Sequence, residues 1–288
     1  MSEQYNMTLE ELAALQRQQI ELIAEVDRIC KKCGIKYNIV GGTMLGAIRH
    51  KGYIPWDDDA DIGFLREEYE KFRKACKYEL DPDKYYMQDL RDTPGYRWGY
   101  GKLRRKNTEF VRLNQENMPY EKGISIDLMP FDNVPDGIFA MRWHFLRCYL
   151  YRKFFWSHIG KNTAEHWWQR LLFRSMDFVP RKTLVASFEK FIEKCNKYKD
   201  SKLVRILTFP TPKGDGLFGY ERRWYEELAI YPFEELNLPG PKDYAGYLQV
   251  KYGDYMKMPP ENKRKVHPIS KLKLLPKSEV GSEDEQEV

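Results

Sequence analysis

The sequence lacks both a disulfide framework and an apolar stretch long enough to cross a membrane. Its five cysteines are an odd number at irregular spacing, so we expect reduced thiols. Cys30 and Cys33 form a C-x-x-C pair at the end of a helical pattern, where a place in the helix is favoured over a zinc or redox role. No run approaches the roughly 20 apolar residues of a membrane span, and the first residues do not resemble a signal peptide. We therefore expect a cytoplasmic protein.

The phosphate-binding motif G-x-x-x-x-G-K-[ST] is also missing, and the Gly41-Gly42 turn is not a G-x-G-x-x-G motif. The basic residues are dispersed among acids and form no continuous stripe, which argues against nucleic-acid binding. With 42% hydrophobic and 32% charged residues, the chain has enough apolar mass for a globular core. Its mild net charge of +5 is compatible with an anionic substrate or a membrane surface and demands neither.

Four acids gather in the segment YIPWDDDADIGF: Asp57, Asp58, Asp59 and Asp61. Such carboxylates repel one another unless a cation neutralises them. In an extended chain, side chains alternate between faces, so Asp57, Asp59 and Asp61 share one face. Oxygen-only ligands suit Mg²⁺ or Mn²⁺, and an ion held in this way commonly activates phosphate oxygens. The cluster therefore predicts a metal site and phosphoryl chemistry.

Two other interpretations of the acidic cluster stay open. Asp57, Asp59, Asp61 and Glu68 match positions 1, 3, 5 and 12 of a calcium-binding loop, but position 6 is Ile62 where such a loop needs glycine. No helix is predicted to enter the loop either. A solvated acidic loop without any ligand is the second alternative, although apolar residues flank the acids on both sides.

Gly41-Gly42-Thr43 connects a predicted strand to a predicted helix. Free N–H groups and the helix dipole at such a junction favour a phosphate, and a plain turn is the alternative. The basic candidates for phosphate contact are Arg49, Lys51, Lys102, Arg104 and Arg105, of which Arg49 and Lys102 are preferred. His50 and His267 are candidate bases or hydrogen-bond donors, with an ordinary surface or core-edge position as the alternative.

Hydrophobic periodicity predicts an α+β protein. The expected elements are a helix over 8–33, a strand over 36–40, a helix over 43–52, a strand over 59–65, a helix over 66–80, a strand over 85–90, a strand or hairpin over 101–113, a strand over 123–131, helices between 137 and 200, a strand over 203–209 and a helix over 244–254. Thr8 and Glu11 form a capping box before the first helix, and Gly34 ends it.

The strand over 123–131 alternates, so Asp127 projects opposite its apolar neighbours and can add a third carboxylate to the metal cradle. Asp132 is expected to be a turn residue. The helical region between 137 and 200 is rich in aromatic residues, which could form either core or a cation-π cage for a quaternary ammonium, with core favoured. These aromatics are Trp143, Phe154, Phe155, Trp156, Trp167 and Trp168.

The segment GGTMLGAIRHKGYIPWDDDADIGF (41–64) closely resembles the signature of the LicD family, bacterial phosphocholine transferases related to fukutin and fukutin-related protein. The blocks over 123–132 and 252–267 agree with it. The resemblance implies a nucleotidyltransferase-like mixed sheet with flanking helices and a helical, aromatic-rich addition. It divides the chain into a catalytic core with its N-terminal helix (1–135), an addition that completes the substrate site (136–278) and a disordered acidic tail (279–288).

The resemblance also implies an activity, which is transfer of a phospho-alcohol, usually phosphocholine, from a CDP-linked donor such as CDP-choline. The acceptor would be a hydroxyl of a cell-surface glycan such as lipopolysaccharide or teichoic acid, with release of CMP. If the acceptor is lipid-linked, the mildly basic surface would dock on the inner face of the cytoplasmic membrane. The alternatives are a nucleotidyltransferase acting on a small molecule or glycan, and a non-catalytic protein that binds a nucleotide or glycan.

The residues implied by the resemblance fall into three groups. Asp59, Asp61 and Asp127 would hold Mg²⁺ or Mn²⁺ and act in catalysis. Asp57 or Asp58 would position the acceptor or accept its proton. The substrate-contacting set comprises Gly41, Gly42, Thr43, Arg49, Lys102, Arg104 and His267, and Tyr252, Asp254 and Arg264 would close the donor pocket with His267.

Overall fold

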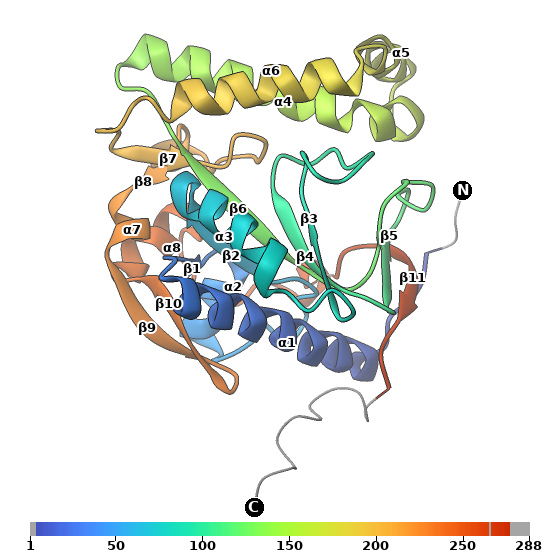
Figure 1. The fold of residues 1–288 in the computed structure, drawn as a ribbon, viewed down its shortest axis with the longest axis vertical. Coiled ribbons are helices and arrows are strands. Elements are labelled where there is room, and N and C mark those ends of the chain that lie inside the picture. The colour runs from blue at the N-terminus through green and yellow to red at the C-terminus, as the bar shows by residue number, and fades with distance from the viewer. Residues whose placement is uncertain (1–3, 265, 277–288) are drawn as a thin grey trace, which may run out of the picture.

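The computed structural model describes residues 4–264 and 266–276, and the predicted acidic tail lies outside these residues. A mixed sheet forms the centre of the fold (Figure 1). Its strands run in the order β1 (Asn38–Ile39), β2 (Asp61–Leu65), β6 (Ser125–Asn133), β4 (Gly101–Arg105) and β3 (Tyr85–Gln88), and β7 (Leu203–Arg205) and β8 (Tyr220–Glu221) extend it from the far end of β6. The predicted α+β class with a mixed sheet is confirmed.

One strand pair sets the position of the acidic residues. β2 and β6 run parallel, with Asp61 directly opposite Asp127. β6 is buried along its whole length, because it also pairs antiparallel with β4 on its other side and with β7 at its end. A buried strand can carry polar side chains only where other groups form hydrogen bonds or ion pairs with them.

The predicted helices of the first half are present. α1 (Leu9–Cys33) begins after the Thr8 capping box and ends at Gly34, whose φ of 63° is left-handed. α3 (Arg66–Glu79) follows β2 directly. α2 (Gly41–Arg49) begins two residues before the predicted start at Thr43, so both glycines belong to its first turn.

Several strand pairings could not be predicted from the local sequence pattern. The segment 101–113 is not a hairpin, because β4 pairs with β3 and β6, whereas β5 (Glu109–Arg112) pairs with β11 (Ile269–Lys273). A hairpin of β9 and β10 was not predicted either. The remaining elements are β9 (Leu228–Phe233), β10 (Leu236–Pro241), α7 (Arg223–Glu226), α8 (Tyr244–Tyr252) and the 3₁₀ turns Gly214–Gly216 and Glu261–Lys263.

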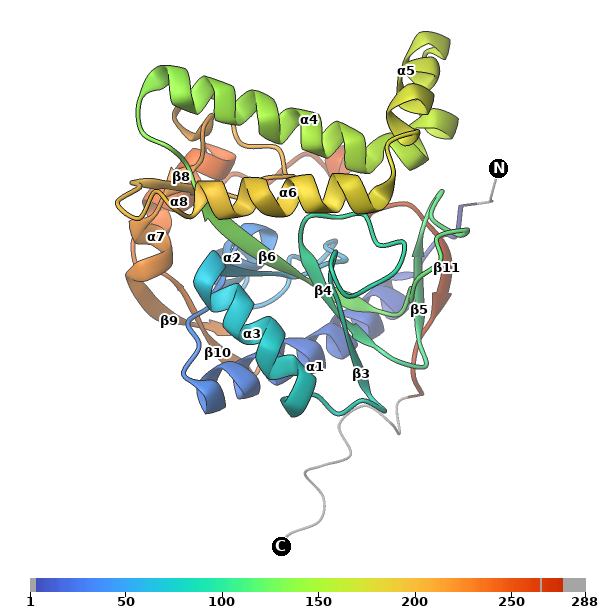
Figure 2. The same cartoon turned by 45° about the horizontal axis from the view of Figure 1, so that its top comes forward.

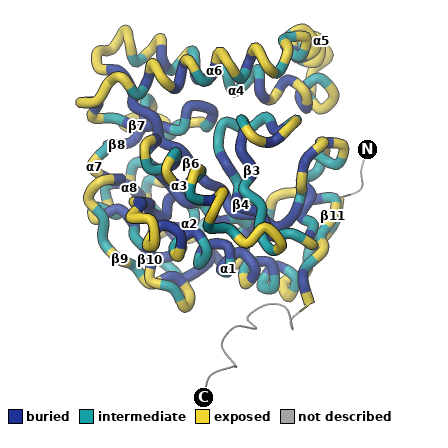
Figure 3. Tube along the Cα trace, in the orientation of Figure 1, coloured by how far each residue is buried: buried dark blue, intermediate teal, exposed yellow. Residues whose placement is uncertain are grey.

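α4 (Ile138–Thr163), α5 (Trp167–Asp177) and α6 (Arg181–Cys195) form a layer along one side of the molecule, and α5 projects from its end (Figures 1 and 2). Phe155 is buried, as a core position requires, but the preference for core is wrong for four tryptophans. Trp143, Trp156, Trp167 and Trp168 are 61%, 39%, 76% and 52% exposed. An outer layer packs only its inner side against the body, so the aromatic residues on its other faces meet solvent (Figure 3).

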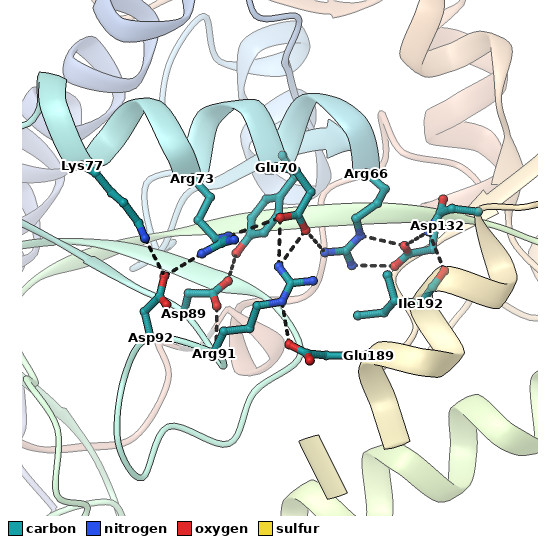
Figure 4. Close-up of polar contacts among 12 residues, drawn as sticks. Arg66, Glu70, Arg73, Lys77, Asp89, Arg91, Asp92, Asp132, Glu189 and Ile192 are labelled. Atoms are coloured by element: carbon teal, nitrogen blue, oxygen red, sulfur yellow. Dashed lines mark hydrogen bonds and ion pairs between the residues drawn. The ribbon is translucent and has the colours of Figure 1, made fainter. Parts of the chain in front are cut away.

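Asp132 is not the turn residue that was expected. It lies on β6 with a fully buried carboxylate, which accepts two hydrogen bonds of 2.7 Å from Arg66 on α3. Asn196 donates a third bond, also of 2.7 Å. Figure 4 shows this pair at one end of a charged network along α3. The ion pair joins the central strand to two helices.

We expect Asp132→Ala to lower the free energy of unfolding by about 3–5 kcal/mol, because it leaves a buried Arg66 charge without its partner. Asp92→Ala is the matched control, since Asp92 belongs to the same network but is about half exposed in its pair with Arg73. Its cost should be about 0–1 kcal/mol. Urea denaturation of both variants measures the difference, and equal losses would contradict a structural role for the buried pair.

Candidate active site

Three carboxylates meet where β2 and β6 begin to pair. Asp61 and Asp127 are direct neighbours across the parallel strands, and Asp59 approaches from the loop before β2. Burial raises the pKa of Asp61, and the charges of Asp59 and Asp127 raise it further. The pKa of Asp59 is raised for the same reasons, first by burial and then by Asp127. The structure thus brings the three predicted metal-binding residues together, with Asp127 buried and Asp59 and Asp61 half-buried, as a group that favours a positive charge.

The two glycines at the start of α2 are required by the carboxylates themselves. Gly41 has a left-handed φ of 60°, and a Cβ atom there would lie 2.4 Å from Oδ2 of Asp61. A Cβ atom at Gly42 would lie 2.6 Å from Oδ2 of Asp57. A larger residue at either position would force the acid side chain to move.

Hydrogen bonds fix this helix end against the sheet. The Gly41 N–H donates to the Tyr247 hydroxyl at 2.8 Å, and the Asp61 N–H donates to Oγ1 of Thr43, also at 2.8 Å. Thr43, predicted to touch substrate, therefore holds β2 in place through its hydroxyl. Tyr247 was missed by sequence reasoning, because nothing local links it to the glycine turn.

Asp58 differs from its neighbours because its carboxylate is fully paired. His267 donates from Nδ1 to Oδ1 of Asp58 at 2.7 Å, and Arg112 donates from Nη1 to Oδ2 at 2.7 Å. Burial alone would raise the pKa of Asp58, but the His267 hydrogen bond and the Arg112 charge bring it below its ordinary value. Asp57 lacks such partners, and burial together with Asp59 and Asp58 raises its pKa to about 7.

Two glutamines of α1 donate hydrogen bonds to backbone carbonyls of the acidic loop. Gln16 donates from Nε2 to the Asp57 carbonyl at 2.9 Å. Gln19, which is fully buried, donates to the carbonyls of Asp58 at 3.0 Å and of Ser125 at 3.2 Å. The same amide therefore holds the acidic loop and the start of β6 together. Glutamines on the apolar face of an amphipathic helix were the sequence signal for this role.

The predicted basic residues separate into two groups. Lys102 forms an ion pair with Asp127, its register partner on β6, and Arg104 donates to Oε1 of Gln88 at 2.8 Å. Both line a cavity of about 600 Å³ beside Asp59 and Asp127, which we call the main cavity. Arg49 lies at the other end of α2 from the acids and donates to the Tyr255 carbonyl at 3.0 Å. Arg105 instead pairs with Glu21 at 3.3 Å.

A second lysine near the acids was missed by sequence reasoning. Lys251 on α8 is the positive charge that acts on the pKa of Asp61, lowering it against the larger effect of burial. Arg264, from the same C-terminal block, lies 4.8 Å from the centre of the Trp56 ring beside the acidic segment. The block over 252–267 thus reaches the acidic segment through His267 and Arg264.

The main cavity opens beside Asp59 and Asp127 and has a volume of about 600 Å³. This volume is in the range of small-molecule sites. The rings of Trp98 and Trp156 lie 5.7 Å apart at its wall. Its other charged and aromatic lining residues are Arg97, Tyr100, Lys102, Arg104, Phe110, Arg112, Tyr120, Lys122, Arg152, Lys153, Phe155, Phe209 and His267. The mixture of basic and aromatic groups suits an anionic ligand with a planar or cationic part.

Asp58, Asp59 and His267 form another group with metal-ligand chemistry, since one ligand atom of each lies within 4.8 Å of the others among the described residues. The Arg112 guanidinium already occupies Asp58 and also lies 3.4 Å from Oδ2 of Asp59. Lys102 likewise pairs with Asp127, so positive side chains stand beside both acidic groups. Asp59, Asp61 and Asp127 stay the ligand set predicted from the sequence.

We expect Gly41→Ala to destabilise the protein by more than Gly214→Ala. Both glycines have a left-handed φ, 60° and 67°, but a Cβ atom at Gly214 meets open space. The control should cost about 1–2 kcal/mol from backbone conformation alone, and the clash with Asp61 adds to this at Gly41. Thermal unfolding followed by circular dichroism compares the two, and equal melting temperatures would contradict the tight contact.

Comparison with known proteins agrees with this geometry. Residues 34–157 match the family model described as LicD/FKTN/FKRP, nucleotidyltransferase domain. The chain is 28% identical over 260 residues to the lipopolysaccharide cholinephosphotransferase LicD of Haemophilus influenzae, covering 86% of this chain and 92% of that protein. It is 42% identical over 40 residues to the human ribitol 5-phosphate transferase FKRP, covering 14% of this chain and 8% of that protein. Residues 34–157 are therefore a domain of the LicD/FKTN/FKRP nucleotidyltransferase type, and the similarity to LicD extends over most of the chain.

Proposed function

We propose that this protein is a metal-dependent transferase that moves a phospho-alcohol from a CDP-linked donor to a hydroxyl of a cell-surface glycan and releases CMP. Phosphocholine is the favoured head group and CDP-choline the favoured donor. The observation that carries the proposal is the meeting of Asp59, Asp61 and Asp127 at the edge of a 600 Å³ cavity lined by basic and aromatic side chains. The relatives named above, one acting on lipopolysaccharide and the other a ribitol 5-phosphate transferase, support transfer to a glycan.

The three carboxylates fit a divalent metal ion. Asp61 and Asp127 offer oxygen ligands from paired strands and Asp59 offers one from the preceding loop. Their mutual repulsion and desolvation, seen in the raised pKa values of Asp59 and Asp61, favour a cation among them. Mg²⁺ or Mn²⁺ held there would offset the charge of the donor diphosphate and of the leaving group.

The positive side chains of the chain itself would orient the diphosphate. Lys102 is held against Asp127 at the cavity wall, so its ammonium can turn to a phosphate oxygen when a donor enters. Arg104 and Arg112 line the same wall with rigid guanidinium groups, which match phosphate geometry. Trp98 and Trp156 offer ring faces for the base or for a quaternary ammonium.

We expect Asp61→Asn and Asp127→Asn to lower turnover of CDP-choline by about 100-fold or more, because each removes charge at the point where the leaving phosphate is stabilised. EDTA should abolish turnover of the wild type, and Mg²⁺ or Mn²⁺ should restore it. Asp200→Asn, at an exposed acid, is the control. A Mg²⁺-dependent rise in melting temperature should be present in the wild type and lost in both site variants.

Full activity in either site variant would contradict the proposed site. Product analysis separates the two enzymatic alternatives, since phospho-alcohol transfer yields CMP and a phospho-glycan, whereas nucleotidyl transfer yields pyrophosphate and a nucleotidylated acceptor. A donor that binds without being consumed would indicate a binding protein. Comparing CDP-choline, CDP-ethanolamine, CDP-glycerol and CDP-ribitol would define the head group.

We further propose that the protein docks on the inner face of the cytoplasmic membrane through α4 and α5. In the part of the chain that the structure describes, no helix combines the length and apolar character of a membrane span. On α4, Phe139, Trp143, Leu146 and Leu150 follow helical spacing and are 84%, 61%, 43% and 42% exposed. Their spacing places them on one face of the helix as an apolar stripe.

α5 carries a second set of exposed apolar residues. Trp167, Trp168, Leu171 and Leu172 are all more than half exposed, and Phe173 is the one buried residue of the helix. The segment 138–176 carries seven Arg or Lys residues and a single acid, Glu165. An amphipathic surface with tryptophans and basic residues is suited to an anionic lipid interface. α4 also lines the cavity, which would bring a lipid-linked acceptor close to the site.

We expect the triple variant Trp168→Ser, Leu171→Ser and Leu172→Ser to bind vesicles containing phosphatidylglycerol at least about 10-fold more weakly than the wild type, because it removes the apolar face of α5. Tyr78→Ser, at an 87% exposed ring on α3, is the control and should bind normally. Co-sedimentation with anionic and with phosphatidylcholine vesicles measures the effect. Unchanged binding by the triple variant would contradict this surface, and light scattering would show whether α5 instead joins two copies of the chain.

A further inference from the structure

A side chamber of about 130 Å³ lies next to the main cavity. Its walls come from α4 and from the loop that follows β7, and its charged lining residues are Arg152 and Arg205. Arg152, Phe209 and Pro210 line both the chamber and the main cavity. The two spaces therefore share a wall, although the chamber plays no part in the site described above.

Arg205 is a buried charge with few partners. It is 2% exposed, and its Nη2 donates to the Phe209 carbonyl at 3.3 Å. Its guanidinium carbon lies 5.4 Å from the centre of the Phe145 ring. Nε and Nη1 have no hydrogen-bond partner among the described residues. A buried guanidinium in this situation keeps a large desolvation cost that no counter-charge offsets.

The charged groups around Arg205 do not compensate its positive charge. Asp132 is the register partner of Arg205 on β6, but its carboxylate is already bound by Arg66 and Asn196. Arg152 supplies a second guanidinium, which lies 5.5 Å from the Tyr149 ring. Burial lowers the pKa of Arg205 and the Arg152 charge lowers it further, while the Cys148 thiol acts in the opposite direction. Two neighbouring guanidinium groups in an otherwise apolar chamber favour an anion between them.

We propose that this chamber binds an oxyanion, a phosphate or carboxylate group carried by the glycan acceptor, while the acceptor hydroxyl lies in the main cavity. This assignment rests on the proposed function, which defines the acceptor. Guanidinium forks match the oxygens of both anions. Since a water takes about 30 Å³ in the liquid, the chamber has room for one tetrahedral oxyanion and not for a nucleotide. The acceptor is thus an acidic glycan.

Tungstate, a heavy phosphate analogue, tests the chamber directly. Crystals of the full chain soaked in sodium tungstate should show an anomalous peak within hydrogen-bond distance of Arg205 and Arg152. The peak should disappear in Arg152→Gln and persist in Arg147→Gln, an arginine of the same helix that does not line the chamber. Peaks only beside Lys102 and Arg112, or no peak at saturating tungstate, would overturn the proposal.

Thermal unfolding supplies a second test that does not depend on crystals. Inorganic phosphate at ten times its Kd should raise the wild-type melting temperature by about 3 °C over sodium chloride of equal ionic strength. Arg205→Met should melt no lower than the wild type without phosphate, because it removes an uncompensated buried charge, and should gain less from phosphate. Arg152→Gln should show the same reduced gain. A large fall in melting temperature for Arg205→Met, with an undiminished phosphate gain in Arg152→Gln, would show a purely structural arginine.

Inhibition kinetics separate an acceptor group from free phosphate. Inorganic phosphate should compete with the glycan acceptor and not with the CDP-linked donor. Phosphate that binds at Arg205 without inhibiting transfer would overturn the assignment to the acceptor. The crystallographic and thermal measurements involve no turnover, so their failure is distinguishable from a failure of the proposed transferase activity.

Discussion

The parallel pairing of β2 and β6 is the constraint on which the rest of the site depends. It puts Asp61 beside Asp127 in a buried position, where two like charges repel strongly because water does not screen them. Positive side chains and open space around the two carboxylates reduce this repulsion. Lys102 faces Asp127, Lys251 acts on Asp61, and the glycines of α2 leave space for the carboxylates. The site is therefore held in a state that a divalent cation would relieve.

Local features of this arrangement could be predicted from the sequence. The capping box and Gly34 mark the two ends of α1. The alternation over 123–131 predicted that Asp127 points away from its apolar neighbours on the strand. These features depend on residues within a few positions of one another, where backbone preferences and periodicity decide the outcome. The proximity of Asp59, Asp61 and Asp127 followed from combining two such strands with the family resemblance.

Contacts between distant segments could not be predicted in this way. β11 pairs with β5, and this pairing brings His267 and Arg112 to the same carboxylate, that of Asp58. His267 lies 209 residues after Asp58 in the sequence. No local pattern identifies such a partner. The expected turn at Asp132 failed for the same reason, since the Arg66 guanidinium that justifies burying it comes from another helix. The exposed tryptophans of α4 and α5 show that periodicity alone does not tell which face is covered.

Buried charges in this protein fall into two kinds, and the difference separates structure from function. Arg66 and Asp132 satisfy each other with two short hydrogen bonds, so no further group is needed there. The carboxylates of Asp59 and Asp61 are half-buried and the guanidinium of Arg205 is buried, and none of these charges is fully compensated. A folded chain keeps such charges only at a cost in stability, and a ligand of opposite charge removes that cost. Under the proposed function, the acidic group would take a cation beside the donor phosphates, and the Arg205 chamber would take an anionic group of the acceptor.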